Sequence, residues 1–133
     1  MNKKTLLILV AAVVIVAGGL YIFVFSSPDG EKPPVRAEYW PDDFIIVNVL
    51  DSTYLLKAGI VLVVDDEGIL DSLAADNMRI RDTLNAVMSS VDLDTLLDVS
   101  ARDYVKGLLA DAVNERLEIT NVIDIYFSEY VIQ

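Results

Sequence analysis

The sequence predicts a small α+β domain attached to an N-terminal transmembrane helix, and two observations lead to this expectation. One is a nearly unbroken apolar run at residues 5–25 of the 133-residue chain, and the other is a change of hydrophobic period along the rest. Segments with the alternating pattern of strands come first and last, and segments with the helical period of about 3.6 residues lie between them. The expected order is therefore β-β-α-α-β, with the helices against a small sheet.

The apolar run from Thr5 to Phe25 contains no charged residue and no proline. As a helix it would extend about 30 Å, which is the thickness of a bilayer core. Lys3 and Lys4 precede it and acidic residues follow it, so residues 1–4 are expected in the cytoplasm and the domain outside, with the cytoplasmic membrane crossed once. A cleaved signal peptide is the alternative, but its apolar region usually runs only about 7–15 residues.

Small residues form two pairs within this run. Ala11 and Gly18 lie seven positions apart, as do Ala12 and Gly19, which places small side chains where another membrane helix can approach closely. The alternative is that glycine and alanine are simply frequent in membrane helices. We treat these four residues as candidates for packing between membrane helices.

Residues 26–41 contain all four prolines of the chain and predict a proline-rich linker without regular structure. Fully extended, such a linker reaches at most about 55 Å, so the domain stays near the bilayer. The expected division of the chain is residues 1–4 in the cytoplasm, a transmembrane helix at 5–25, a linker at 26–41 and an extracytoplasmic domain at 42–133.

Five elements are expected within the domain. They are strands at 44–50 and 53–64 joined by a two-residue turn at Asp51-Ser52, helices at 69–90 and 101–117, and a last strand at 122–132. A short turn between two β-rich segments favours an antiparallel hairpin. In the second helix Tyr104 is expected to be buried, and in the last strand Ile123, Ile125, Phe127 and Val131 are expected to share one face.

Composition excludes several classes of function. The chain has no histidine and no cysteine, so it has no disulfide, thiol nucleophile, Ser-His triad or His/Cys zinc site. Residues 40–133 carry 6 basic and 18 acidic side chains, a net charge of −12, which excludes nucleic acid as a partner and disfavours anionic lipid. This charge serves solubility or selects a basic partner surface.

The acidic stretch 65–71 lacks the alternating ligands of a calcium loop and is interpreted as a solvated turn. We therefore predict a protein that is not an enzyme, with no catalytic residue, metal, cofactor or small-molecule substrate. Arg79, Arg81 and Asp82 stand out because cations are few in the domain. Arg79 and Asp82 are spaced for a local ion pair worth a few tenths of a kcal/mol. The alternative is that Arg79 or Arg81 reaches an acidic patch on a neighbouring copy, and we treat all three as candidate subunit contacts.

Several short segments carry a family resemblance. The segment Ile125–Gln133 reads IYFSEYVIQ, and FIIVNV at 44–49, YLLK at 54–57, IRD at 80–82 and YVKGLL at 104–109 precede it in order. VNERL at 113–117 completes the set. Together with the N-terminal anchor they resemble the FliL family of single-pass proteins associated with the bacterial flagellar basal body.

The resemblance implies a domain similar to stomatin-type (SPFH) domains, lying just outside the cytoplasmic membrane. It also implies association with MotA/MotB-like stator units and the basal body, in support of stator activation, torque generation and motility. A homo-oligomer, forming a ring when tethered, is expected on the same grounds. The alternative is a membrane-tethered extracytoplasmic sensor or ligand-binding domain that acts through a partner protein.

Overall fold

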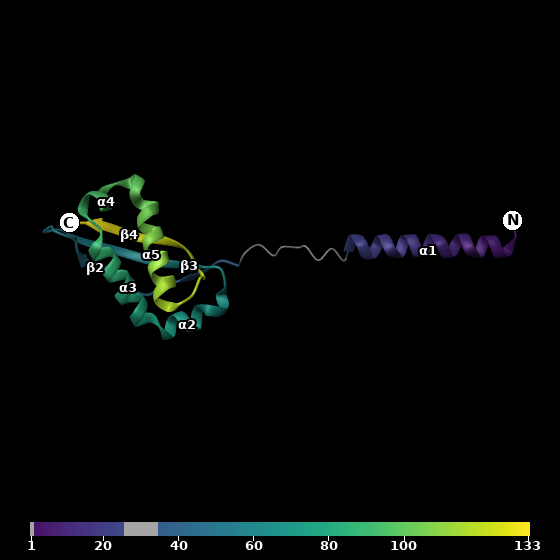
Figure 1. Cartoon of the computed structure of the whole chain (residues 1–133), viewed down its shortest axis with the longest axis horizontal. Helices are drawn as coiled ribbons and strands as arrows, with labels where there is room; N and C mark the ends of the chain where they lie inside the picture. Colours follow the sequence, from purple (N-terminus) through teal and green to yellow (C-terminus); the bar gives the residue numbers. More distant parts are fainter. Residues whose placement is uncertain (1, 26–34) are drawn as a thin grey trace. The chain divides into compact units, whose positions relative to one another are not determined.

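The computed structural model describes residues 2–25 and 35–133 (Figure 1). The chain divides into two compact units, one within residues 1–33 and one within residues 34–133. The described part of the second unit, residues 35–133, is called the head domain below. Most of the linker expected at residues 26–41 lies outside the described residues.

Helix α1, Lys3–Phe25, accounts for the first unit. Its stretch Lys3–Ile22 is long and apolar enough to cross a membrane, and all the described side chains along it are exposed. An apolar helix with exposed side chains is suited to lipid, where every backbone group is satisfied within the helix. The expected helix at residues 5–25 is confirmed, and it is consistent with a single-pass anchor.

The head domain contains one antiparallel sheet of four strands. These are β1 (Ala37–Tyr39), β2 (Ile45–Asn48), β3 (Leu55–Val64) and β4 (Val122–Ile132). Strand β3 is central: β4 pairs along one of its edges, and β1 and β2 pair in succession along the other. The segment between β1 and β2 includes buried Pro41, which has no N–H to donate to a neighbouring strand.

Strand β1 corrects part of the predicted linker. Residues 37–39 were expected to lack regular structure, yet they pair with residues 62–64 of β3. The Tyr39 hydroxyl donates a hydrogen bond to Asn77 Oδ1 at 2.7 Å, and both Ala37 and Tyr39 pack against the core. Three residues are too few to show the alternation of a strand, and the prolines on either side favoured the prediction of a linker.

Strands β2 and β3 form the expected antiparallel hairpin, but the turn is longer than two residues. The last pair is Asn48 with Leu55, and the Val49 N–H donates to the Tyr54 carbonyl oxygen at 3.0 Å. Asp51 has a φ of 49°, in the left-handed region that aspartate tolerates better than most residues.

The helices of the head domain are shorter and more numerous than expected. They are α2 (Leu70–Ala75), α3 (Asn77–Ser90), α4 (Leu93–Leu97) and α5 (Arg102–Leu117), with 3-10 turns at Glu67–Ile69 and Val99–Ala101. The helix expected at 69–90 is interrupted at Asp76, and the helix expected at 101–117 is confirmed. Asp92 begins α4, since its carboxylate accepts the Thr95 N–H at 2.8 Å.

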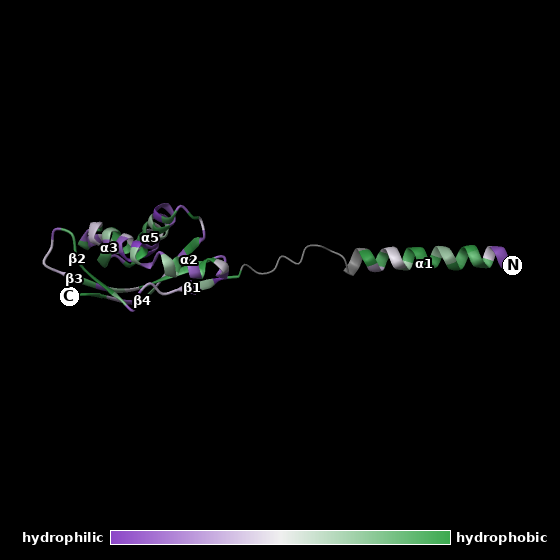
Figure 2. Ribbon diagram, turned by 90° about the horizontal axis from the view of Figure 1, so that it is seen from below, coloured by the Kyte–Doolittle hydropathy of each residue, from purple (hydrophilic) through white to green (hydrophobic). Residues whose placement is uncertain are grey.

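One face of the sheet is covered by the helices, and Figure 2 shows α2, α3 and α5 on the same side of the strands. The core forms where these layers meet. Its central members are Leu56, Ala58, Ile60, Leu62 and Val64 of β3, Ile80, Leu84 and Met88 of α3, and Val105, Leu109 and Val113 of α5. The mixed α/β domain is thus confirmed, and the likeness to stomatin-type domains stays a prediction.

Three expected core positions are wrong. Tyr104 is 62% exposed and its neighbour Val105 is buried, so the buried face of α5 begins one position later than expected. In β4, Ile123 and Val131 are exposed because the pairing with β3 slips by one residue at two bulges. Each slip turns the following side chains to the other face. The residues of β4 that meet the core are Val122, Ile125, Phe127, Tyr130 and Ile132.

Candidate functional site

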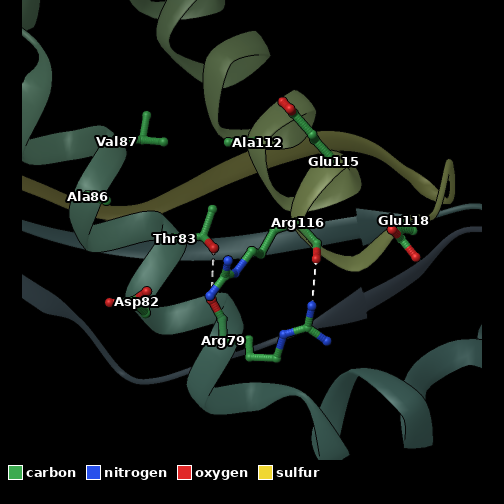
Figure 3. Close-up of a pocket in the computed structure, with 9 residues that line it drawn as sticks. All are labelled: Arg79, Asp82, Thr83, Ala86, Val87, Ala112, Glu115, Arg116 and Glu118. Carbon is green, nitrogen blue, oxygen red and sulfur yellow. Dashed lines mark hydrogen bonds between the residues drawn. The ribbon is translucent and has the colours of Figure 1, made fainter.

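An open groove of about 650 Å³ runs between α3 and α5 (Figure 3). Small residues, Ala86, Val87 and Ala112, line its middle, and charged residues surround them. The complete lining is Arg79, Asp82, Thr83, Ala86, Val87, Ala112, Glu115, Arg116 and Glu118. Two of the three predicted subunit-contact residues, Arg79 and Asp82, therefore lie in one groove, and Arg81 does not line it.

Arg79 joins the two helices that form the groove. Its Nη1 lies 3.1 Å from Asp76 Oδ1, and its Nη2 donates to the Arg116 carbonyl oxygen at 2.7 Å. Figure 3 shows this guanidinium group below the last turn of α5. Carbonyl groups in the last turn of a helix have no partner within the helix, and a cation there also interacts favourably with the helix dipole. Arg79 thus caps α5 from α3.

The expected ion pair between Arg79 and Asp82 does not form, and Asp76 takes the place of Asp82. Long side chains on a helix point back toward its N-terminus. Arg79 therefore reaches the carboxylate three positions before it rather than the one three positions after it. The side chain of Asp82 forms no hydrogen bond or ion pair with any other residue in the described part of the chain.

Arg81 connects α3 to the segment that enters β2. Its Nη2 lies 2.6 Å from Asp42 Oδ2, and both side chains are a little over one-third exposed. The buried Nε atom of Arg81 has no hydrogen-bond partner among the described residues. The guanidinium groups of Arg79 and Arg81 are therefore both engaged within a single head domain, and their proposed role between copies stays a prediction.

The unengaged charges of the groove are mainly acidic. Asp82, Glu115 and Glu118 lie along it. Of the two arginines that line the groove, Arg116 has a side chain that makes no ion pair within residues 35–133. The Thr83 hydroxyl already donates to the Arg79 carbonyl oxygen at 2.8 Å. This arrangement suits contact with charged side chains of another protein, because side chains with formal charge can pair across an interface.

The acidic stretch near the end of β3 stabilises local turns. Asp66 Oδ1 accepts the Gly68 N–H at 2.7 Å, and Asp65 Oδ1 accepts from Asn121 Nδ2 at 2.9 Å. Within residues 2–25 and 35–133, no group of three or more acidic side chains is placed to hold a metal ion. The small residues Ala11, Ala12, Gly18 and Gly19 lie exposed on α1, and their packing role stays a prediction.

Burial and hydrogen bonding shift several pKa values around the helices. Burial raises the pKa of Tyr130, whose hydroxyl donates to the Leu96 carbonyl oxygen at 2.8 Å while the Arg102 guanidinium lies 3.6 Å from its ring centre. The pKa of Asp92 is lowered by hydrogen bonds from Thr95, and that of Asp98 by hydrogen bonds from Ser100. Both carboxylates hold the starts of short helical segments.

Sequence reasoning missed three partners of the predicted residues, namely Asp42, Asp76 and Arg116. The position of Asp76, three residues before Arg79, was a readable signal, because residues three apart on a helix are neighbours. The contacts with Asp42 and with the Arg116 carbonyl oxygen join segments far apart in the chain. No local spacing marks them.

Comparisons with known proteins agree on one family. The family model described as "Flagellar basal body-associated protein FliL" matches residues 39–133. A protein of Aquifex aeolicus named "Flagellar protein FliL" is 28% identical over 110 residues, which cover 81% of this chain and 68% of that protein. The matched residues include all of the groove and its partners.

Proposed function

This chain belongs to the FliL family of flagellar basal body-associated proteins, and we propose that it acts in the motor as a partner of MotA/MotB-like stator units. The observation that carries the proposal is the family match over residues 39–133, nearly the whole head domain, in a chain that begins with an apolar helix. The family is one of flagellar accessory proteins and not a known enzyme family. Binding, rather than catalysis, is the expected mode of action.

The proposed topology places residues 1–4 in the cytoplasm, residues 5–25 in the membrane and the head domain outside. Lys3 and Lys4 support this orientation, because lysine next to a span favours the cytoplasmic side. The strong acidic charge of the head domain supports a position off the lipid surface, since anionic headgroups repel it. The head domain would then meet the extracytoplasmic parts of stator units.

Self-association of tethered copies is part of the same proposal. Tethering raises the effective concentration of the head domains and offsets the repulsion between them, which is screened over about 8 Å at physiological salt. Ala11, Ala12, Gly18 and Gly19 would form the packing face within the membrane. A ring of this kind, with stomatin-like heads, would surround or flank a stator unit.

A motility assay tests the proposed function. Deletion of the gene is expected to lower torque under high load, because fewer stator units stay active, and the full chain is expected to restore it. The matched control is a head domain exported without an anchor, which should fail to restore torque. Normal torque at every load in the deletion strain would contradict a stator role.

The sensor alternative has less support. Its natural ligand site is the groove between α3 and α5, but Arg79 is already bound to Asp76 and to the Arg116 carbonyl oxygen. A sensor would also have to signal through a partner, because only residues 1–4 are expected inside the cell. A change in stator number upon deletion, without any added ligand, favours the accessory role.

A further inference from the structure

The face of the sheet that points away from the helices, called the outer face below, carries several exposed apolar side chains. In β3 the residues of the core alternate with Lys57, Gly59, Val61 and Val63, which therefore point outward. Across the pairing, Ile46 of β2 and Val131 of β4 flank Lys57. Large apolar residues at this face that are between 39% and 57% exposed are Phe44, Ile46, Leu55, Tyr126 and Val131.

The pattern of β3 is that of a strand covered on both sides. An antiparallel sheet with one face in water normally alternates apolar and polar residues, whereas strands covered on both faces are apolar throughout. From Ala58 to Val64, β3 has no polar side chain, and outward-facing Val61 and Val63 are only 2% and 1% exposed. Yet within residues 35–133 all the helices pack on the other face (Figure 2). Val61 and Val63 are thus already buried in the structure, and the apolar surface open to a partner is that of the exposed side chains of Phe44, Ile46, Leu55, Tyr126 and Val131.

The charges of the outer face restrict what that partner can be. Lys57 Nζ lies 3.0 Å from Glu129 Oε1 and 4.3 Å from the centre of the Phe44 ring, so this cation is already engaged. Glu38 and Asp124 both pair with Val63, so two carboxylates lie at the end of the face near Val63. An apolar surface with an acidic end fits a segment that combines apolar side chains with lysine or arginine.

We infer that the outer face docks such a segment, apolar and basic, from the extracytoplasmic part of a stator protein. This inference rests on the proposed function and names the surface that would serve it. A second copy docked through its own outer face is a poor occupant, because two such faces in contact would oppose the carboxylates of Glu38 and Asp124. An anionic lipid surface is repelled by the same groups.

Site-specific cross-linking tests the docking surface. The chain has no cysteine, so the single-cysteine variants Ile46→Cys and Met78→Cys each take a thiol-reactive photo-crosslinker at one position. Ile46 lies on the outer face, and Met78, 73% exposed on α3, is the matched control. Both full-length variants are placed in membranes with the stator units. The expected result is at least tenfold more stator adduct at position 46 than at position 78.

A second variant keeps the test independent of labelling. Ile46→Lys places a cation where a basic segment is expected, and should lower stator co-purification at least tenfold, while Met78→Lys changes it less than twofold. Adducts of position 46 with lipid or with another copy, or equal stator adducts at both positions, would overturn the docking surface. Stator units that co-purify without an adduct at position 46 would overturn it and leave the proposed function standing. No co-purification at all would overturn both.

Discussion

The two faces of the sheet are built from the same strands but differ in how deeply their side chains are buried. On the inner face, every second residue of β3 meets the helices and is almost fully buried. On the outer face, the intervening residues are also largely apolar, yet those of the flanking strands remain partly exposed. The difference teaches that burial on the outer face varies along the sheet. Val61 and Val63 are buried there as fully as the inner residues, whereas Leu55 of β3, Ile46 of β2 and Val131 of β4 stay exposed.

The largest expected difference between the faces is in stability. Leu55 and Leu56 are neighbours in β3, but Leu56 is fully buried in the core and Leu55 is 39% exposed. Leu56→Ala should lower the free energy of unfolding by about 2–5 kcal/mol, since it opens a cavity, and Leu55→Ala by no more than about 1 kcal/mol. Urea denaturation of the two variants measures this. Equal losses would show that the outer face belongs to the folding core.

Gly59 lies where neighbouring segments approach the outer face of β3 closely. A Cβ at this position would overlap Ser128 Oγ and lie 3.1 Å from the Asp43 carbonyl oxygen and 3.3 Å from the Glu129 nitrogen. Gly59→Ala should therefore cost about 1–3 kcal/mol of stability, as the bulge at Ser128 is forced to move.

The matched control is Gly107→Ala in α5, where nothing lies within 4 Å of the added Cβ. Because glycine weakens a helix interior, this change should stabilise the domain by about 0.5–1 kcal/mol. Thermal unfolding of both variants should shift in opposite directions. A shift in the same direction would contradict the close approach at Gly59.

Asn114 ties the inner helix layer to the sheet. Its Nδ2 donates to the Val122 carbonyl oxygen at 2.9 Å, and its Oδ1 accepts the Val122 N–H at 3.0 Å. Asn114→Ala leaves both backbone groups of the strand without these partners and should lower stability by about 1–2 kcal/mol. Asn85→Ala in α3, where the amide makes no such contact among the described residues, is the control and should be near neutral. Equal effects on the urea midpoint would contradict this role.

The smallest expected effect is on acid stability. Hydrogen bonds to Asp92 and Asp98 lower their pKa values in the folded state, so their contribution is complete above the ordinary aspartate pKa near 4 and is lost as pH falls through the lower folded value. The double variant of Asp92→Ala and Asp98→Ala should lose less stability than the native chain between about pH 5 and pH 2. Urea midpoints across this range measure the difference, with Asp111→Ala as the control. An unchanged pH profile in the double variant would contradict the capping roles.

Sequence predicted the long periodic elements of the head domain and failed on the short ones. The strands at β2, β3 and β4 and the helices α3 and α5 are confirmed because each repeats its pattern over several residues. Strand β1 and helix α4 were missed, since three and five residues are too few to show a period.

The inward faces of β4 and the partners of the candidate residues depend on tertiary structure. The bulges at Ile123 and Ser128 exist only in the pairing with β3, so alternation alone placed Ile123 and Val131 on the wrong face. The ion pair between Arg81 and Asp42 joins segments far apart in the chain, so no local sequence pattern predicts it. The groove between α3 and α5 likewise arises only when the two helices pack.

The hydrogen bonds between the Asn114 side chain and the Val122 backbone also affect how the border of the sheet can meet another strand. A strand at the border of a sheet is an open template for another strand, and many copies held on one surface would be prone to join in that way. Here the Asn114 side chain occupies the backbone groups of Val122 at the start of β4, and two bulges interrupt the strand. The opposite border of the sheet is interrupted between β1 and β2. These features therefore disfavour the addition of a strand from another head domain at either border of the sheet.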